Sequence, residues 1–97
     1  MRILGIDPGT ATVGFGIVDY TPPNVFVYVG SGVISTPKTL DAGARLKMIR
    51  EDMLSIFDEY APDQTAVEAL FFFKNAKTVM PVAQARGVIL EALSCRD

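Results

Sequence analysis

The chain contains no histidine and has a single cysteine, Cys95. Without histidine, the Ser–His–Asp and Cys–His nucleophile systems and the HExxH zinc site are excluded. With one cysteine, neither an internal disulfide nor a cysteine-rich zinc site can form. The shortage of nitrogen and sulfur ligands favours a hard cation held by oxygen atoms.

The sequence also lacks a long apolar run and a strong excess of charge. A membrane-spanning helix needs about 20 apolar residues, and the apolar run after Arg2 ends already at Asp7, too early for a signal peptide core. The formal net charge of −2 does not by itself indicate nucleic-acid binding. With 97 residues, of which 49% are hydrophobic and 21% charged, the chain is expected to be one small globular domain of a soluble, cytoplasmic protein.

The first third of the chain predicts three strands, at residues 2–6, 12–20 and 25–35, joined by turns rich in proline and glycine. Their close succession favours an antiparallel meander. Glycines occupy alternate positions in the second and third strands: Gly14 and Gly16, then Gly30 and Gly32. Because alternate residues of a strand share one face, these glycines predict the close approach of another backbone or a helix.

The rest of the chain predicts a helix at residues 40–60, a short strand at 65–68 and a second helix. A helical crossover normally returns a strand parallel to an earlier one. Pro81 either kinks a second helix that begins near Asn75 or marks the first turn of one that begins near Met80. The order β-β-β-α-β-α indicates an α/β fold with a mixed sheet.

Two carboxylates lie at the carboxyl ends of strands in this predicted sheet. Asp7 ends the first strand and Glu68 the fourth, and parallel neighbours lie about 4.8 Å apart. Both side chains would then project from the edge where open α/β sheets bind ligands. Two close carboxylates repel unless a cation lies between them, which predicts Mg²⁺, or Mn²⁺ in its place. Alternatively, Asp7 stabilises a turn and Glu68 caps the following helix.

Other candidate ligand contacts lie in two short segments. Thr10 follows Asp7 closely and either stabilises the turn or contacts a phosphate. The spacing from Gly9 to Gly14 resembles a phosphate loop, but Phe15 stands where that motif requires lysine, so it is not a Walker loop.

The second segment is an aromatic and basic run. Phe71, Phe72 and Phe73 are consecutive, and neither a helix nor a strand can point all three into one core. Beside Lys74 and Lys77, exposed aromatics suit stacking on unpaired bases. Alternatively, core and dimer contacts absorb all three rings, and the basic residues form a solvated face.

Several motifs together resemble the RuvC family of bacterial Holliday-junction resolvases, which have a ribonuclease-H-like fold. The matching segments are Ile3-Leu4-Gly5-Ile6-Asp7-Pro8-Gly9-Thr10, Val13-Gly14-Phe15-Gly16, Gly30-Ser31-Gly32, Arg45-Leu46, Val67-Glu68 with Phe71, and Gln84-Ala85-Arg86-Gly87-Val88. The first of these is shared with other ribonuclease-H-like and actin-like proteins. The Glu68 strand and the Gln-Ala-Arg-Gly helix make the resemblance specific.

The resemblance implies a dimeric, metal-dependent endonuclease that resolves four-way junctions in recombination and repair by phosphodiester hydrolysis. Four carboxylates of the family hold two metal ions; Asp7 and Glu68 match the first two, and the other two belong to a C-terminal helix that this chain does not contain. Residues 1–97 therefore resemble an incomplete resolvase domain, without its last strand and helix and expected to be inactive alone. The DNA-binding residues implied or suggested are Thr10, Phe71, Lys74, Asn75, Lys77 and Arg86.

Partners implied by the resemblance are junction DNA, a second copy of the chain and a branch-migration helicase complex. The dimer is also suggested by residues 82–93, which are apolar on most of the helix circumference. Two other functions stay open at this point. One is an actin-like ATPase or sugar-kinase fragment that binds nucleotide phosphates, and the other is a non-catalytic relative that binds nucleic acid.

Overall fold

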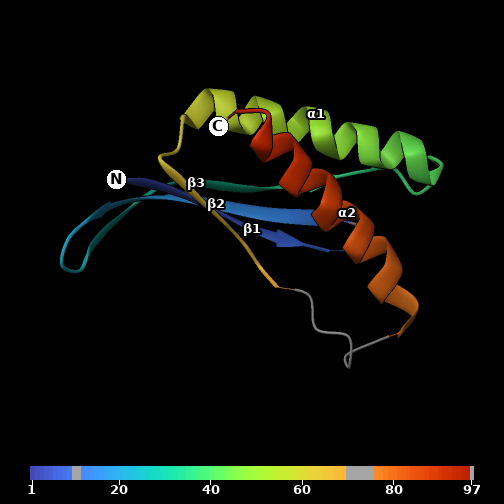
Figure 1. The fold of residues 1–97 in the computed structure, drawn as a ribbon, viewed down its shortest axis with the longest axis horizontal. Coiled ribbons are helices and arrows are strands. Elements are labelled where there is room, and N and C mark those ends of the chain that lie inside the picture. The colour runs from blue at the N-terminus through green and yellow to red at the C-terminus, as the bar shows by residue number, and fades with distance from the viewer. Residues whose placement is uncertain (10–11, 70–75, 97) are drawn as a thin grey trace.

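The computed structural model of the chain describes residues 1–9, 12–69 and 76–96. Figure 1 shows two helices lying together on one side of a single sheet. The elements in chain order are β1 (Arg2–Pro8), β2 (Thr12–Thr21), β3 (Val25–Ser35), α1 (Ala42–Tyr60), β4 (Gln64–Val67) and α2 (Ala76–Ser94). The predicted α/β order is confirmed, and the predicted ends of most elements differ from these by one or two residues.

The four strands form one mixed sheet in the order β3-β2-β1-β4. β1 pairs antiparallel with β2, and β2 pairs antiparallel with β3, which confirms the predicted meander. α1 then crosses over the sheet and returns the chain as β4, parallel to β1. This crossover places two sequence-distant strands, β1 and β4, side by side with the same direction.

The core lies between one face of the sheet and the two helices. Alternate residues of β1 and β2, such as Leu4 and Ile17, point toward the helices and are fully buried. Met53 of α1 and Ile89 of α2 meet them from the helical side and are also fully buried. Burying side chains of this size contributes about 1.5–3 kcal/mol each, so this layer supplies most of the stability of the fold.

The ends of α1 follow from local chemistry. Asp41 is the N-cap residue, and its Oδ1 accepts a hydrogen bond of 2.8 Å from the backbone N–H of Ala44. At the other end Ala61 adopts a left-handed conformation with φ of 45°, and its N–H donates to the carbonyl of Phe57. Pro62 follows and prevents continuation of the helix, as the sequence predicted.

α2 packs along α1; one ion pair joins the two helices, and a second joins α1 to the turn after α2. The Nε of Arg50 lies 2.7 Å from Oε1 of Glu91, and the Nε of Arg96 lies 2.7 Å from Oδ1 of Asp58. Pro81 lies inside α2, so the structure supports the longer of the two predicted helices. Neither helix of the described residues is long and apolar enough to cross a membrane.

The two glycine pairs differ in the space around them. On β3, a Cβ at Gly30 would lie 3.0 Å from the hydroxyl of Tyr60, and a Cβ at Gly32 would lie 3.0 Å from the ring of Phe15. These two glycines admit aromatic rings, not a backbone or a whole helix. On β2, a Cβ at Gly16 would meet nothing within 4 Å, so the predicted close approach at this position is wrong for the described residues.

Candidate active site at the carboxyl edge of the sheet

Asp7 and Glu68 are brought together by the pairing of β1 with β4. The last Cα partners in this parallel pair are Ile6 and Val67, so Asp7 and Glu68 each follow immediately at the same edge. The backbone N–H of Glu68 donates a 2.9 Å hydrogen bond to the carbonyl of Ile6, which extends the ladder by one residue. The sequence predicted this juxtaposition, and the register confirms it.

Both carboxylates are on the face of the sheet that the helices do not cover. Leu4 and Ile6 point into the core, so the alternating residues Gly5 and Asp7 lie on the opposite face. Asp7 lies within β1 and is exposed, so it is not the turn residue of the alternative interpretation. Glu68 is also exposed and stands between β4 and the segment leading to α2.

An open hollow of about 440 Å³ lies beside the two acids. Its floor is formed by the small residues of three strands, and its lining consists of Gly5, Ile6, Asp7, Gly14, Phe15, Gly16, Ala66, Val67 and Glu68. Because the floor carries almost no side chains, a ligand held by the acids could lie directly against the backbone. Gly5 and Ala66 were not among the site residues predicted from the sequence. The signal that finds them is their position two residues before each acid, on the same strand face.

Arg86 lies at this edge but on the helical side. Its Nε donates a 3.1 Å hydrogen bond to the backbone carbonyl of Glu68. The guanidinium therefore ties α2 to the end of β4 and places one positive charge beside the acidic edge.

The donor set fits a hard divalent cation, but only in part. Two exposed carboxylates on adjacent parallel strands supply the oxygen ligands that Mg²⁺ and Mn²⁺ prefer. Among the residues that the structure describes, no group of three or more metal-ligating side chains forms. Two protein carboxylates with water and substrate oxygens are a common arrangement for Mg²⁺, which keeps several non-protein ligands.

Most of the predicted DNA contacts fall where the structure gives no description. Thr10, Phe71, Lys74 and Asn75 lie outside the described residues. Lys77 belongs to the first turns of α2, but its side chain is likewise outside the description. Of the predicted DNA-binding side chains, Arg86 alone has a described contact, the one to Glu68.

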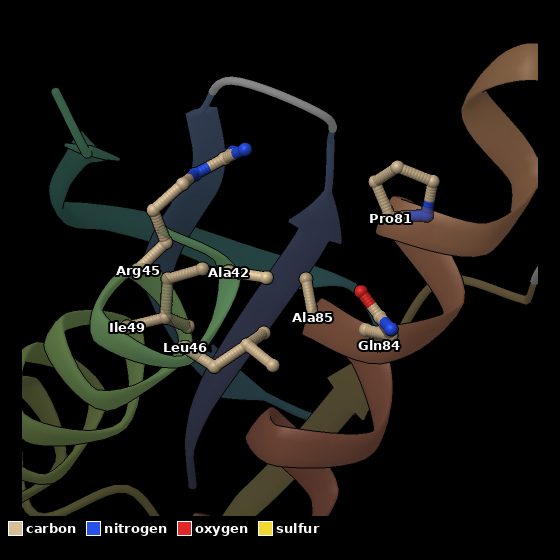
Figure 2. A pocket seen from close by; sticks show the side chains of 7 residues that line it. All are labelled: Ala42, Arg45, Leu46, Ile49, Pro81, Gln84 and Ala85. Atoms are coloured by element: carbon tan, nitrogen blue, oxygen red, sulfur yellow. The ribbon is translucent and has the colours of Figure 1, made fainter. Parts of the chain in front are cut away.

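A second, smaller space lies between the helices. Figure 2 shows Ala42 and Leu46 of α1 and Ala85 of α2 pointing into it, with Gln84 at its margin. Its volume of about 30 Å³ has room for one or two water molecules but for no larger ligand. Arg45 borders this space and donates from Nε to the hydroxyl of the buried Thr36 at 3.1 Å, which joins α1 to the end of β3. The space between the helices is therefore too small for a nucleotide or a DNA strand.

Comparison with known proteins finds one family over nearly the whole chain. Residues 3–97 match the family model described as crossover junction endodeoxyribonuclease RuvC. The RuvC protein of Fusobacterium nucleatum is 51% identical over 92 residues, which are 95% of this chain and 48% of that protein. The RuvC protein of Thermosipho melanesiensis is 45% identical over 97 residues, which are 100% of this chain and 61% of that protein.

Among solved structures, the chain is similar to Thermus thermophilus RuvC in complex with a Holliday junction substrate. The TM-score is 0.84 at 27% sequence identity, and the match covers 95% of this chain and 58% of that one. The chain thus spans about half to three fifths of the length of the relatives that it matches.

Proposed function

The chain belongs to the RuvC family of crossover junction endodeoxyribonucleases, and from this premise we propose that it supplies Asp7 and Glu68 to the active site of a Holliday-junction resolvase. The observation that carries this proposal is the β1–β4 register, which puts the two acids at one exposed edge above a glycine floor. The reaction is hydrolysis of a DNA phosphodiester in the strands that cross at a four-way junction.

The two acids have complementary tasks in this proposal. Asp7, on the central strand β1, and Glu68, at the end of the edge strand β4, would both hold the divalent metal of the complete site, with Asp7 as its central ligand. A pair of divalent ions supplies charge stabilisation at the attacking and leaving oxygens of the phosphodiester. Mg²⁺ is the proposed ion, with Mn²⁺ as a substitute, because both are hard cations that accept carboxylate and phosphate oxygens.

The remaining residues of the edge orient the DNA. The floor of Gly5, Gly14 and Gly16 lets the scissile phosphate approach the strands closely. Arg86 holds the end of β4 through its bond to the Glu68 carbonyl and so fixes the position of that acid. Thr10, Phe71, Lys74, Asn75 and Lys77 are proposed to contact the junction, with aromatic stacking on unpaired bases and cations on phosphates.

We also propose that the protein acts as a homodimer through the outer face of α2. Met80 and Leu90 are exposed there at 65% and 42%. Between them a Cβ at Gly87 would meet nothing within 4 Å, so the glycine leaves room for a second helix. Sedimentation equilibrium tests this: Leu90→Glu should weaken self-association about tenfold or more, whereas Lys47→Glu on the exposed surface of α1 should not. A dimer unaffected by Leu90→Glu would contradict this interface.

Cytoplasmic location and cooperation with a branch-migration helicase belong to the same proposal, since both accompany resolvase activity in the family. Family membership over nearly the whole chain disfavours the actin-like ATPase alternative.

The proposed activity can be tested in a chimaera. Residues 1–97 would be joined to the remaining part of the Fusobacterium relative, of which this chain matches 48%. With Mg²⁺ the chimaera should cut a synthetic four-way junction, and it should leave a linear duplex of the same sequence intact. The isolated chain should not cut either substrate. A chimaera that folds and binds the junction but does not cut it would contradict the proposal.

Metal binding by the two acids can be tested without any activity. Added Mn²⁺ should broaden the amide resonances of residues 5–8 and 66–69 first, because paramagnetic broadening falls steeply with distance. The variant Asp7→Asn should lose this selective effect, and Asp52→Asn, an exposed acid on α1, should keep it. Broadening spread evenly over all exposed carboxylates would show that no specific site exists in this chain.

A further inference from the structure

The free edge of the sheet at β3 has the features of a second binding surface, remote from the carboxylates. β3 is the outermost strand in the order β3-β2-β1-β4, and no other strand of the described residues pairs with its outer side. Figure 1 shows the β2–β3 hairpin projecting beyond the two helices. The part of β3 near the hairpin turn therefore has neither helix against its faces.

This edge strand concentrates the exposed apolar surface of the molecule. Of the eight exposed large hydrophobic residues among the described ones, five belong to β3: Val25, Phe26, Val27, Tyr28 and Val33. Phe26 and Tyr28 are exposed at 62% and 70%. Scattered exposed hydrophobic residues are ordinary, but five in a single free edge strand are a local concentration that indicates an interaction site.

The apolar residues are distributed on both faces of the strand. Phe26 is the partner of Tyr20, and their rings stack with centroids 4.7 Å apart. Tyr28 shares the face of Phe26, whereas Val25 and Val27 alternate to the other face. A strand added beside β3 would find apolar neighbours above and below the sheet, as well as the unpaired backbone groups of the edge.

The edge also lacks charge, and this decides the class of partner. No residue between Thr21 and Pro37 is charged. Nucleic acids and anionic lipid surfaces are held chiefly by lysine and arginine, so neither suits this edge. Natural edge strands are commonly protected by charged residues or proline, and residues 25–35 contain neither.

We propose that β3 is a docking edge for an uncharged, extended segment of another protein, which adds to the sheet as a further strand. Main-chain hydrogen bonds along the edge would provide affinity, and the exposed rings and valines would select apolar side chains. A second copy of the chain, paired edge to edge through β3, is the competing occupant. Together with the α2 interface proposed above it would give tetramers or longer assemblies, and the dependence of protection on protein concentration distinguishes it.

The test uses the purified chain and a synthetic probe. The probe is a capped nine-residue peptide of alternating threonine and valine with a central tyrosine, N-methylated at alternate positions so that it has only one pairing edge. Its binding should slow amide hydrogen exchange within residues 25–35 by about tenfold or more and leave exchange in α1 unchanged.

The double variant Tyr28→Lys with Val33→Lys should weaken binding about tenfold or more, because it places charges on the edge. Ser55→Lys, on the exposed surface of α1, is the matched control and should bind normally.

Three results would overturn the proposal. One is unchanged exchange in β3 at millimolar peptide. Another is equal protection of β3 by a single-stranded oligothymidylate, which would indicate a nucleic-acid surface. The third is protection that grows with protein concentration in the absence of the peptide, which would identify a second copy as the occupant.

Discussion

The two faces of the sheet are built from the same strands but carry different kinds of residue. Toward α1 and α2 the strands present large aliphatic side chains, such as Leu4 and Ile17, which are fully buried. Away from the helices the alternating positions hold Gly5, Asp7 and Gly16, and farther along the hairpin the exposed ring of Tyr28. Since strand residues alternate, one stretch of sequence specifies both faces at once.

This difference separates stability from binding. The covered face excludes water and contributes most of the hydrophobic free energy of folding. On the open face, within the described residues, little is buried, so its side chains can be chosen for ligands at small cost to the fold. Substitutions on the two faces should therefore have opposite profiles, one changing activity and the other changing stability.

The largest effect should come from an open-face acid. Asp7→Asn in the chimaera keeps the size of the side chain but removes the charge that would hold a metal ion. We expect junction cleavage to fall by about a thousandfold, because metal stabilisation of the transition state is worth several kcal/mol. The urea midpoint should stay nearly unchanged, since Asp7 is exposed. An equally large loss of stability would mean that Asp7 serves the fold and not the site.

The next effect should come from the covered face. Ile17→Ala deletes a fully buried side chain and should lower the free energy of unfolding by about 3 kcal/mol. The neighbouring Val18→Ala is the control, because Val18 lies on the other face and is only half-buried; its cost should stay below about 1 kcal/mol. Equal costs measured by urea denaturation would show that the open face is covered in solution.

More of the covered face than of the open face could be predicted from the sequence. The covered face was predictable because aliphatic residues recur at the strand and helix periods, as Ile49 and Met53 do in α1. The meeting of Asp7 with Glu68 was also predictable, since it needs only a crossover and parallel pairing. The floor of the site was predictable only in part. The alternation of Gly14 and Gly16 placed them on one face, but the pairing of that face with Gly5 and Asp7 depends on the register, which glycines do not specify.

The stability of the two helices that cover the sheet should depend on pH. The pKa of Asp58 is held below its ordinary value by the hydrogen bond from Arg96, and the pKa of Glu91 by the hydrogen bond from Arg50. A carboxyl whose pKa is lowered on folding stabilises the fold above its unfolded-state pKa, which is 3.8 for Asp and 4.5 for Glu. This stabilisation is lost as the pH falls through those values and below.

The urea midpoint should therefore be steady at neutral pH and fall as the pH drops below about 4.5. The double variant Asp58→Asn with Glu91→Gln should start lower at pH 7 and lose less on acidification. One pair joins α1 to α2 and the other joins α1 to the turn after α2, so salt should reduce the difference between the two proteins. Parallel acid curves for the two proteins would contradict a role of these pairs in stability.

The smallest effect is also the most direct comparison of the faces, because it adds one methyl group to each. Gly16 is on the open face, has no positive φ, and a Cβ there would meet nothing within 4 Å. Gly16→Ala should raise the free energy of unfolding by about 0.5–1 kcal/mol, since alanine loses less backbone entropy on folding. On the covered face, a Cβ at Gly32 would lie 3.0 Å from the Phe15 ring, so Gly32→Ala should lower stability by about 1 kcal/mol as the ring is displaced. If Gly16→Ala stabilises the chimaera but slows junction cleavage, the open-face glycine is kept for the ligand. If cleavage is unchanged, the phosphate does not pass over this part of the floor.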